Sequence, residues 1–183
     1  MTKPLEICLF RHGEVEFDKW AWSSASSLRA LVEHYDSQQI ILPPTTPPPA
    51  NHFEVVVCSC LPRSISSAKT LFQRYDRSDE LFREAELPNL PPLPLKLPAI
   101  ILFVIARMMW RCGAEENCES YAAFKGRAKD AARELVGIAE TNTNVAFVGH
   151  GLINFFIAQE LLQLGFEGPK APIREHWAGP CIR

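Results

Sequence analysis

The sequence has 183 residues, of which 47% are hydrophobic and 22% are charged. This length fits one compact domain, which we expect to span residues 1–183. Lysine and arginine total 19 against 21 aspartates and glutamates, giving a net charge of −2. The charge balance therefore gives no reason to expect a nucleic-acid partner, and any anion-binding site has to be built locally.

The cysteines and the N-terminal residues favour a reduced, cytoplasmic protein. Residues Met1 to Glu6 contain no long apolar run, so we expect no signal peptide. Cys58 and Cys60 are spaced C-x-C without a second pair at zinc-ligand spacing, which makes a metal site from cysteines the less favoured alternative. All six cysteines are therefore expected to be reduced: Cys8, Cys58, Cys60, Cys112, Cys118 and Cys181.

Strands and helices alternate along the chain. The predicted elements, in order, are a strand at Leu5–Phe10, a helix at Ser24–Tyr35, a weak strand at Ile40–Leu42, a strand at Glu54–Cys58, helices at Ser64–Tyr75, Leu97–Trp110 and Ser120–Glu140, a strand at Asn144–Val148 and a helix at Leu152–Leu164. The three main strands are apolar without alternation, which indicates burial on both faces of a mostly parallel sheet. This pattern predicts an α/β protein, a three-layer α/β/α sandwich.

Two segments rich in proline, Pro43–Pro49 and Pro88–Pro98, are expected to be loops because proline cannot donate to a strand ladder or sit inside a helix. The second loop leads into the apolar segment Leu97–Trp110. That segment is interrupted by Arg107 and is too short to span a bilayer, so we expect a buried helix and no membrane partner.

Basic residues follow each of the three main strands. The first strand ends in Arg11-His12-Gly13, the second leads to Arg63, and the third ends in Gly149-His150-Gly151. Ligands of open parallel sheets bind beyond the carboxyl ends of the strands, so these side chains are expected to meet at one edge. Helix N-termini at the same edge would add positive potential.

Such a pocket suits a phosphoryl group. Arginine forks match phosphoryl oxygens, and a neutral imidazole can attack phosphorus and form a phosphohistidine that water then hydrolyses. His12 is the candidate nucleophile, and Arg11, Arg63 and His150 are the candidate phosphate-binding groups. Because arginine neutralises the phosphate charge, we expect no metal and no cofactor.

Three motifs make the chain similar to the histidine phosphatase superfamily, which includes the phosphoglycerate mutases. Arg11-His12-Gly13-Glu14 resembles the RHGE signature, the segment from Ser59 to Ala68 resembles S-x-L-x-R-[AS]-x-x-[TS]-A, and Val148-Gly149-His150-Gly151 resembles the motif of the second catalytic histidine. The resemblance covers about Leu5 to Leu164. It implies a phosphoglycerate mutase-like fold and a phosphatase with His12 as nucleophile and Arg11, Arg63 and His150 around the phosphoryl group.

The resemblance also implies an acidic proton donor between the second and third main strands. Leu81-Phe82-Arg83-Glu84 is similar to the family's L-R-E pattern and favours Glu84, while Glu86 is the alternative because it would share a face with Glu84 in an extended segment. Val15 and Phe17 stand where many members have Thr and Asn, which argues against a sugar-phosphate mutase.

Three functions remain open at this stage. The leading one is hydrolysis of a small phosphorylated molecule; the alternatives are a phosphohistidine phosphatase acting on proteins and an inactive protein that binds phosphate or a partner. His34, His52 and His176 have no supporting motif and are expected to be surface or core residues, and Trp177 is expected to pack the C-terminal segment onto the domain. Glu119 and Ser120 resemble a helix start with a capping hydroxyl.

Overall fold

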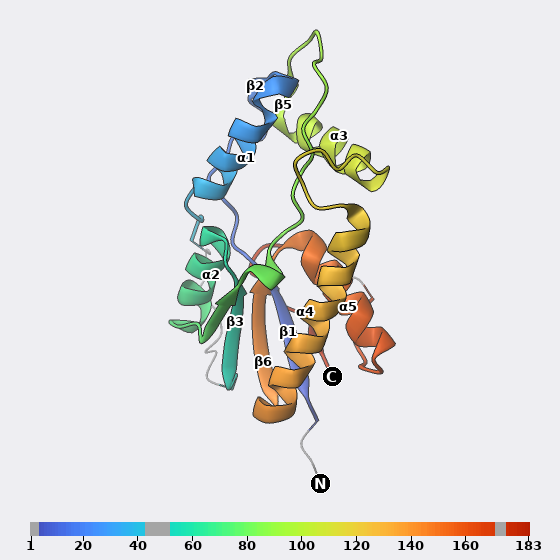
Figure 1. Cartoon of the computed structure of the whole chain (residues 1–183). Coiled ribbons are helices and arrows are strands. Elements are labelled where there is room, and N and C mark those ends of the chain that lie inside the picture. Colours follow the sequence, from blue (N-terminus) through green and yellow to red (C-terminus); the bar gives the residue numbers. More distant parts are fainter. Residues whose placement is uncertain (1–3, 43–51, 171–174) are drawn as a thin grey trace.

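The computed structural model describes residues 4–42, 52–170 and 175–183, so the predicted Pro43–Pro49 loop lies outside the described residues. The elements are β1 (Glu6–Arg11), β2 (Trp22–Ser23), η1 (Ala25–Ser27), α1 (Leu28–Ser37), β3 (Val55–Ser59), α2 (Pro62–Phe72), β4 (Arg77–Asp79), η2 (Glu80–Phe82), β5 (Leu97–Pro98), α3 (Ala99–Arg111), α4 (Tyr121–Asn142), β6 (Asn144–Gly149), α5 (Gly151–Gln163) and β7 (Cys181–Ile182). Figure 1 shows their arrangement.

A mostly parallel sheet lies at the centre of the molecule. Its strand order across the described residues is β4-β3-β6-β1-β7. The pairs β1–β6, β3–β6 and β3–β4 are parallel, and the edge strand β7 runs antiparallel to β1. The three predicted strands and the mostly parallel sheet are therefore confirmed; β4 and β7, which have three and two residues, were not predicted.

The alternating side chains of the strands face two separate helical layers. Ile7, Leu9 and Phe147 belong to the core that contains α4 and α5 residues. Cys8 and Val148 belong to the opposite core, which contains Ala68 of α2. Burial on both faces explains why the strands are continuously apolar, and it confirms the predicted α/β/α sandwich.

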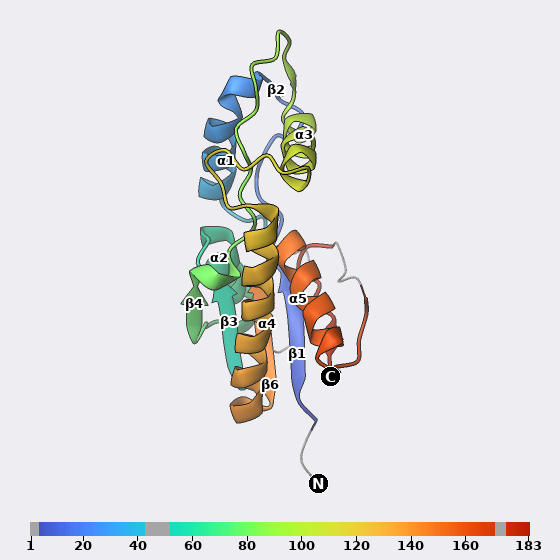
Figure 2. The ribbon, with the colours of Figure 1, turned by 45° about the vertical axis from the view of Figure 1, so that its right-hand side comes forward.

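A smaller unit, which we call the cap, lies beyond the carboxyl ends of the strands (Figures 1 and 2). It consists of α1, α3 and the two-stranded β2–β5 sheet. Its own apolar core contains Ala25, Leu28, Leu90, Leu102 and Ala106. The cap therefore folds over the edge of the sheet at which the sequence places the basic residues.

The prediction that α3 is buried was wrong for one of its faces. Ala99, Leu102, Ala106 and Trp110 are buried, but Ile101, Val104 and Met108 are 39%, 52% and 58% exposed. One face of α3 packs into the cap, and nothing among the described residues covers its other face. No helix in the described part of the chain is long and apolar enough to cross a bilayer.

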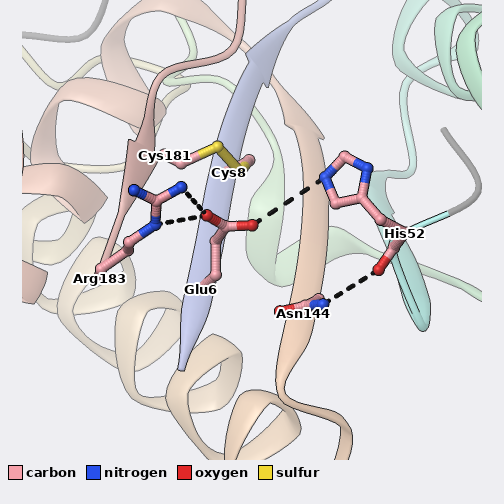
Figure 3. The surroundings of a disulfide bond; sticks show 6 residues. All are labelled: Glu6, Cys8, His52, Asn144, Cys181 and Arg183. Carbon is pink, nitrogen blue, oxygen red and sulfur yellow. Dashed lines mark hydrogen bonds and ion pairs between the residues drawn. A yellow bond between two sulfur atoms is a disulfide. The ribbon is translucent and has the colours of Figure 1, made fainter. Parts of the chain in front are cut away.

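The prediction that all six cysteines are reduced was wrong for one pair. Cys8 and Cys181 form a disulfide, shown in Figure 3, because β7 brings Cys181 directly opposite Cys8 of β1. The two-residue strand β7 has no sequence signal, so the pairing could not be foreseen. The disulfide also removes the argument from reduced thiols on which the predicted cytoplasmic location depended.

The surroundings of this disulfide do not favour a metal. Glu6, Cys8 and Cys181 form the one group of potential ligand atoms found close together in the described part of the chain. The two sulfur atoms are bonded to each other, and Glu6 accepts a hydrogen bond of 2.6 Å from Nε of Arg183 (Figure 3). The two sulfur atoms and the Glu6 carboxylate therefore already have bonding partners.

Candidate active site

The residues that follow the three parallel strands meet beneath the cap. His12 follows β1, Arg63 lies in the first turn of α2, and His150 is the residue immediately before α5. The ring centroids of His12 and His150 are 5.0 Å apart, and the two side chains are almost completely buried. The predicted convergence at one edge of the sheet is therefore present in the structure.

The backbone fixes the orientation of the His12 ring. Nδ1 lies 2.7 Å from the carbonyl oxygen of Gly13. A carbonyl can only accept, so Nδ1 carries the proton and donates it. In the neutral ring, Nε2 then keeps its lone pair, which is the state that a nucleophile requires.

Gly13 is held in place from two sides. Its N–H donates to Oγ of Ser67 at 2.8 Å, and that hydroxyl donates to the carbonyl of Arg63. A Cβ on Gly13 would lie 2.2 Å from Cζ2 of Trp177, so no larger residue fits without displacing the indole. The glycine is thus required by the approach of Trp177, and the C-terminal segment packs on the domain as predicted.

His150 has the opposite tautomer. Nε of Arg63 lies 3.3 Å from its Nδ1, and a guanidinium can only donate, so Nδ1 accepts. The proton of the neutral ring must then reside on Nε2. That buried atom has no hydrogen-bond partner among the described residues, which leaves an N–H group available for a ligand.

Burial and neighbouring cations keep these histidines neutral. Burial lowers the pKa of His12 well below its ordinary value, and the charges of Arg63 and Arg11 lower it further. Burial, Arg63 and His12 likewise lower the pKa of His150. At neutral pH both rings are uncharged, and the local positive charge comes from the arginines.

Arg63 is buried and held by the cap. One of its terminal nitrogens pairs with the carboxylate of Asp36, and its guanidinium lies 5.0 Å from the ring centre of Tyr35. Both partners belong to α1. No local sequence pattern predicts this contact, because it joins residues 27 positions apart across two layers. Arg11 ends β1, and its side chain approaches the start of α5, with Nε 3.8 Å from the position that a Cβ on Gly151 would occupy.

Glu84 is anchored beside the second histidine. Its Oε2 accepts a hydrogen bond of 3.0 Å from the N–H of Leu152, in the first turn of α5, and its Oε1 accepts one of 2.9 Å from Ala85. Glu86 instead pairs with Arg83 at 2.8 Å and accepts from the N–H of Glu119. Of the two candidate acids, Glu84 is the one attached to the helix that begins at His150.

Two arginines hold the segment that carries Glu84. Arg127 of α4 donates to the carbonyls of Leu81 and Arg83 at 2.9 and 2.7 Å, and Arg107 of α3 donates to the carbonyl of Ala85 at 2.9 Å. Side chains from two layers thus fix a segment that has no regular structure of its own.

The start of α4 agrees with the prediction, since the Ser120 hydroxyl accepts a hydrogen bond from the N–H of Ala123.

His176 is a site residue that the sequence analysis missed. Its Nδ1 donates to the carbonyl of His12 at 2.8 Å, and its ring lies 5.4 Å from the His12 ring. Burial lowers the pKa of His176. No sequence motif marks it, and the C-terminal segment brings it to the site by packing along β1. His34 and His52 are exposed, as predicted.

A cavity of about 570 Å³ separates this site from the cap. Arg11, Arg63, Glu84, Glu86 and His176 all contribute to its lining. His12 and His150 are 3% and 1% exposed, so the arginines and His176 form the visible surface above them. The arginines, Glu84 and His176 therefore line a partly open cavity, and the two buried histidines lie beneath that lining.

Comparisons with known proteins agree with this architecture. Scans of protein-family models and of curated proteins give no match. Similar solved structures include a mycobacterial glucosyl-3-phosphoglycerate phosphatase, with 20% identity over 87% of this chain and 80% of that chain and a TM-score of 0.52. The α-ribazole phosphatase from Shigella flexneri has 16% identity over 86% and 79%, with a TM-score of 0.52. YhfR from Bacillus stearothermophilus has 18% identity over 86% and 80%, with a TM-score of 0.53.

Two of these neighbours are phosphatases by name, and at 16–20% identity the likeness shows the fold. Their order of strands and helices matches most of this chain although few residues are identical. The chain therefore has the phosphoglycerate mutase-like fold that the three sequence motifs predict.

Proposed function

We propose that this protein is a histidine phosphatase that hydrolyses a small phosphomonoester through a phosphohistidine on His12. The observation that carries the proposal is the hydrogen bond from Nδ1 of His12 to the Gly13 carbonyl, because it leaves Nε2 with a free lone pair. The depressed pKa of His12 keeps that lone pair available at neutral pH.

The first step transfers the phosphoryl group to the enzyme. Nε2 of His12 attacks phosphorus, a P–N bond forms, and the P–O bond to the leaving group breaks with its electron pair moving to that oxygen. Glu84, in its protonated form, gives its proton to the departing oxygen. Arg11, Arg63 and the Nε2–H group of His150 stabilise the negative charge on the remaining phosphoryl oxygens.

The second step releases phosphate. Water attacks phosphorus, the P–N bond breaks, and its electron pair returns to Nε2 of His12. The Glu84 carboxylate takes the proton of the attacking water, which restores the starting state. Arginine and histidine groups alone balance the charge in both steps, so the proposed reaction requires no metal or cofactor.

The position of the cavity beneath the cap favours a small molecule over a protein substrate. A phosphohistidine on a protein surface would need an open site, whereas the cap covers this one. An inactive protein that binds phosphate is the remaining alternative. The buried Nε2–H group of His150 would receive a ligand in either case, so turnover is what separates the two functions.

A simple assay tests the proposal. The purified protein should hydrolyse p-nitrophenyl phosphate without added metal, keep that activity after exhaustive EDTA treatment, and be inhibited competitively by vanadate. His12→Asn should be inactive. Activity that disappears with EDTA and returns with Mg²⁺ or Zn²⁺ would contradict the mechanism.

A further inference from the structure

The cavity has two chemically different ends. Its base is formed by the phosphate-binding arginines, Glu84 and His176. The opposite wall is largely apolar, with Leu28, Val32, Ile100 and Phe103 from α1 and α3 of the cap and Phe17 and Leu87 from adjoining segments. A phosphomonoester bound at the base would direct its leaving group toward this wall, since the cavity extends in that direction.

Three aromatic rings connect the two ends. Phe17 and Phe103 are stacked, with ring centroids 5.8 Å apart and an interplanar angle of 18°. Tyr35 meets both of them edge-on, at 5.4 and 6.3 Å. The same Tyr35 ring lies 5.0 Å from the guanidinium of Arg63, so the aromatic cluster begins beside the phosphate-binding arginine.

Neutral hydrogen-bonding side chains are few in the cavity lining, although charged side chains such as Lys19, Asp36 and Arg107 also contribute to it. Among the described residues that line the cavity, amide or hydroxyl side chains occur at Tyr35, Asn89 and Asn117. The charged pair Arg29–Glu33 belongs to the exposed rim, where the two side chains are each 70% exposed and bind one another. Hydroxyl groups buried against the apolar wall would lose their water without replacement, which disfavours a sugar there.

We propose that the stacked Phe17–Phe103 pair, with Tyr35, is a binding subsite for a flat apolar group on the leaving-group side of the phosphoester. The substrate class is then an aryl or arylmethyl phosphate rather than a sugar phosphate. Flat rings gain both buried apolar area and favourable ring contacts in such a setting. This inference rests on the proposed function, because it assumes that the phosphoryl group binds at the base.

Ligand binding without turnover tests the subsite. Dissociation constants would be measured by calorimetry for (2-naphthyl)methylphosphonate and for the polar 2,3-dihydroxypropylphosphonate. We expect the naphthyl compound to bind at least 10-fold more tightly. Phe103→Ala should remove most of that preference, and Phe103→Leu, which keeps an apolar side chain but loses the ring, should remove part of it.

The matched control is Phe155→Ala, which removes an exposed phenylalanine of α5 outside the cavity lining and should keep the full preference. Equal affinities, tighter binding of the dihydroxypropyl compound, or a preference unchanged in both Phe103 variants would overturn the subsite. Turnover of p-nitrophenyl phosphate by the same preparation reports the proposed function separately. A missing naphthyl preference with retained turnover would therefore overturn the subsite alone, whereas the absence of both would also contradict the proposed function.

Discussion

The central sheet and the cap use apolar side chains in different ways. Ile7, Val57 and Phe147 of the sheet are 0% exposed, and helices cover both of its faces. In the cap, Trp22 and Val104 are 69% and 52% exposed, and its core is a separate, smaller cluster. The sheet holds the reacting groups rigidly at its edge, whereas the cap is a thinner layer whose apolar residues face either the cavity or the surface.

We therefore expect the sheet edge and the cap to affect different kinetic properties. Substitutions at the sheet edge should reduce turnover of every phosphoester, because the phosphoryl group is common to all of them. Substitutions in the cap cavity should change the preference among leaving groups.

The largest expected effect is that of Arg63→Ala. Loss of a buried cation beside the phosphoryl group should lower kcat by about 100- to 1000-fold for aryl and alkyl phosphates alike. Steady-state kinetics on both substrate types measure this, with circular dichroism to confirm folding. Arg133→Ala, which removes an exposed arginine of α4, is the control and should behave as wild type. A loss confined to one substrate type would mean that Arg63 acts through the cap.

The second effect concerns the disulfide between Cys8 and Cys181, which closes a span of 173 residues. Cys181→Ala should lower the free energy of unfolding by roughly 2–4 kcal/mol, because the unfolded chain gains freedom, while the preference among leaving groups stays unchanged. Denaturant unfolding measures the difference. Cys112→Ala, at an exposed free cysteine, is the control. Equal stability of the two variants under oxidising conditions would show that the disulfide does not form.

The third effect concerns Glu84. An alkoxide leaving group needs a proton and a nitrophenolate hardly does, so Glu84→Gln should slow hydrolysis of an alkyl phosphate by roughly 100-fold and that of p-nitrophenyl phosphate far less. Glu86→Gln is the matched variant in the same segment and should show no such dependence. If Glu86→Gln shows it instead, the proton donor is Glu86.

The smallest effect is the dependence of stability on pH. His12 and His150 have lower pKa values in the folded protein than in the unfolded chain, so the unfolded chain binds more protons below about pH 6.5. The free energy of unfolding should therefore fall as pH decreases from 7 to 5, by at most about 1.4 kcal/mol per pH unit for each histidine. Urea unfolding measures the slope, which should be shallower in His150→Gln. An identical slope would mean that His150 is not buried as a neutral ring.

The sequence predicted the sheet better than the cap. Three continuous apolar runs identified β1, β3 and β6, and the motifs after them placed Arg11, His12, Arg63 and His150 at one edge. Each motif directly follows its own strand, and a parallel sheet brings the ends of these strands together independently of the loop conformations. The pairing of Arg63 with Asp36, by contrast, depends on how α1 packs, for which no local pattern exists.

The missed features have the same cause. His176 reaches the site because the C-terminal segment runs along β1, where the N–H of Arg11 donates to the carbonyl of Ala178. Two-residue strands such as β7 carry no periodicity from which they could be read. The exposed face of α3 was mistaken for core because hydrophobic character alone does not reveal which face of a helix is covered.

The most direct test of the account is chemical trapping of the intermediate. Brief exposure to a ³²P-labelled phosphomonoester, followed by denaturation in alkali, should leave label on the protein. The bond should survive alkali and break in acid, as a phosphoramidate does, and peptide mapping should place it on His12. Label that persists in His12→Asn, or that is lost in alkali and stable in acid, would contradict the phosphohistidine mechanism.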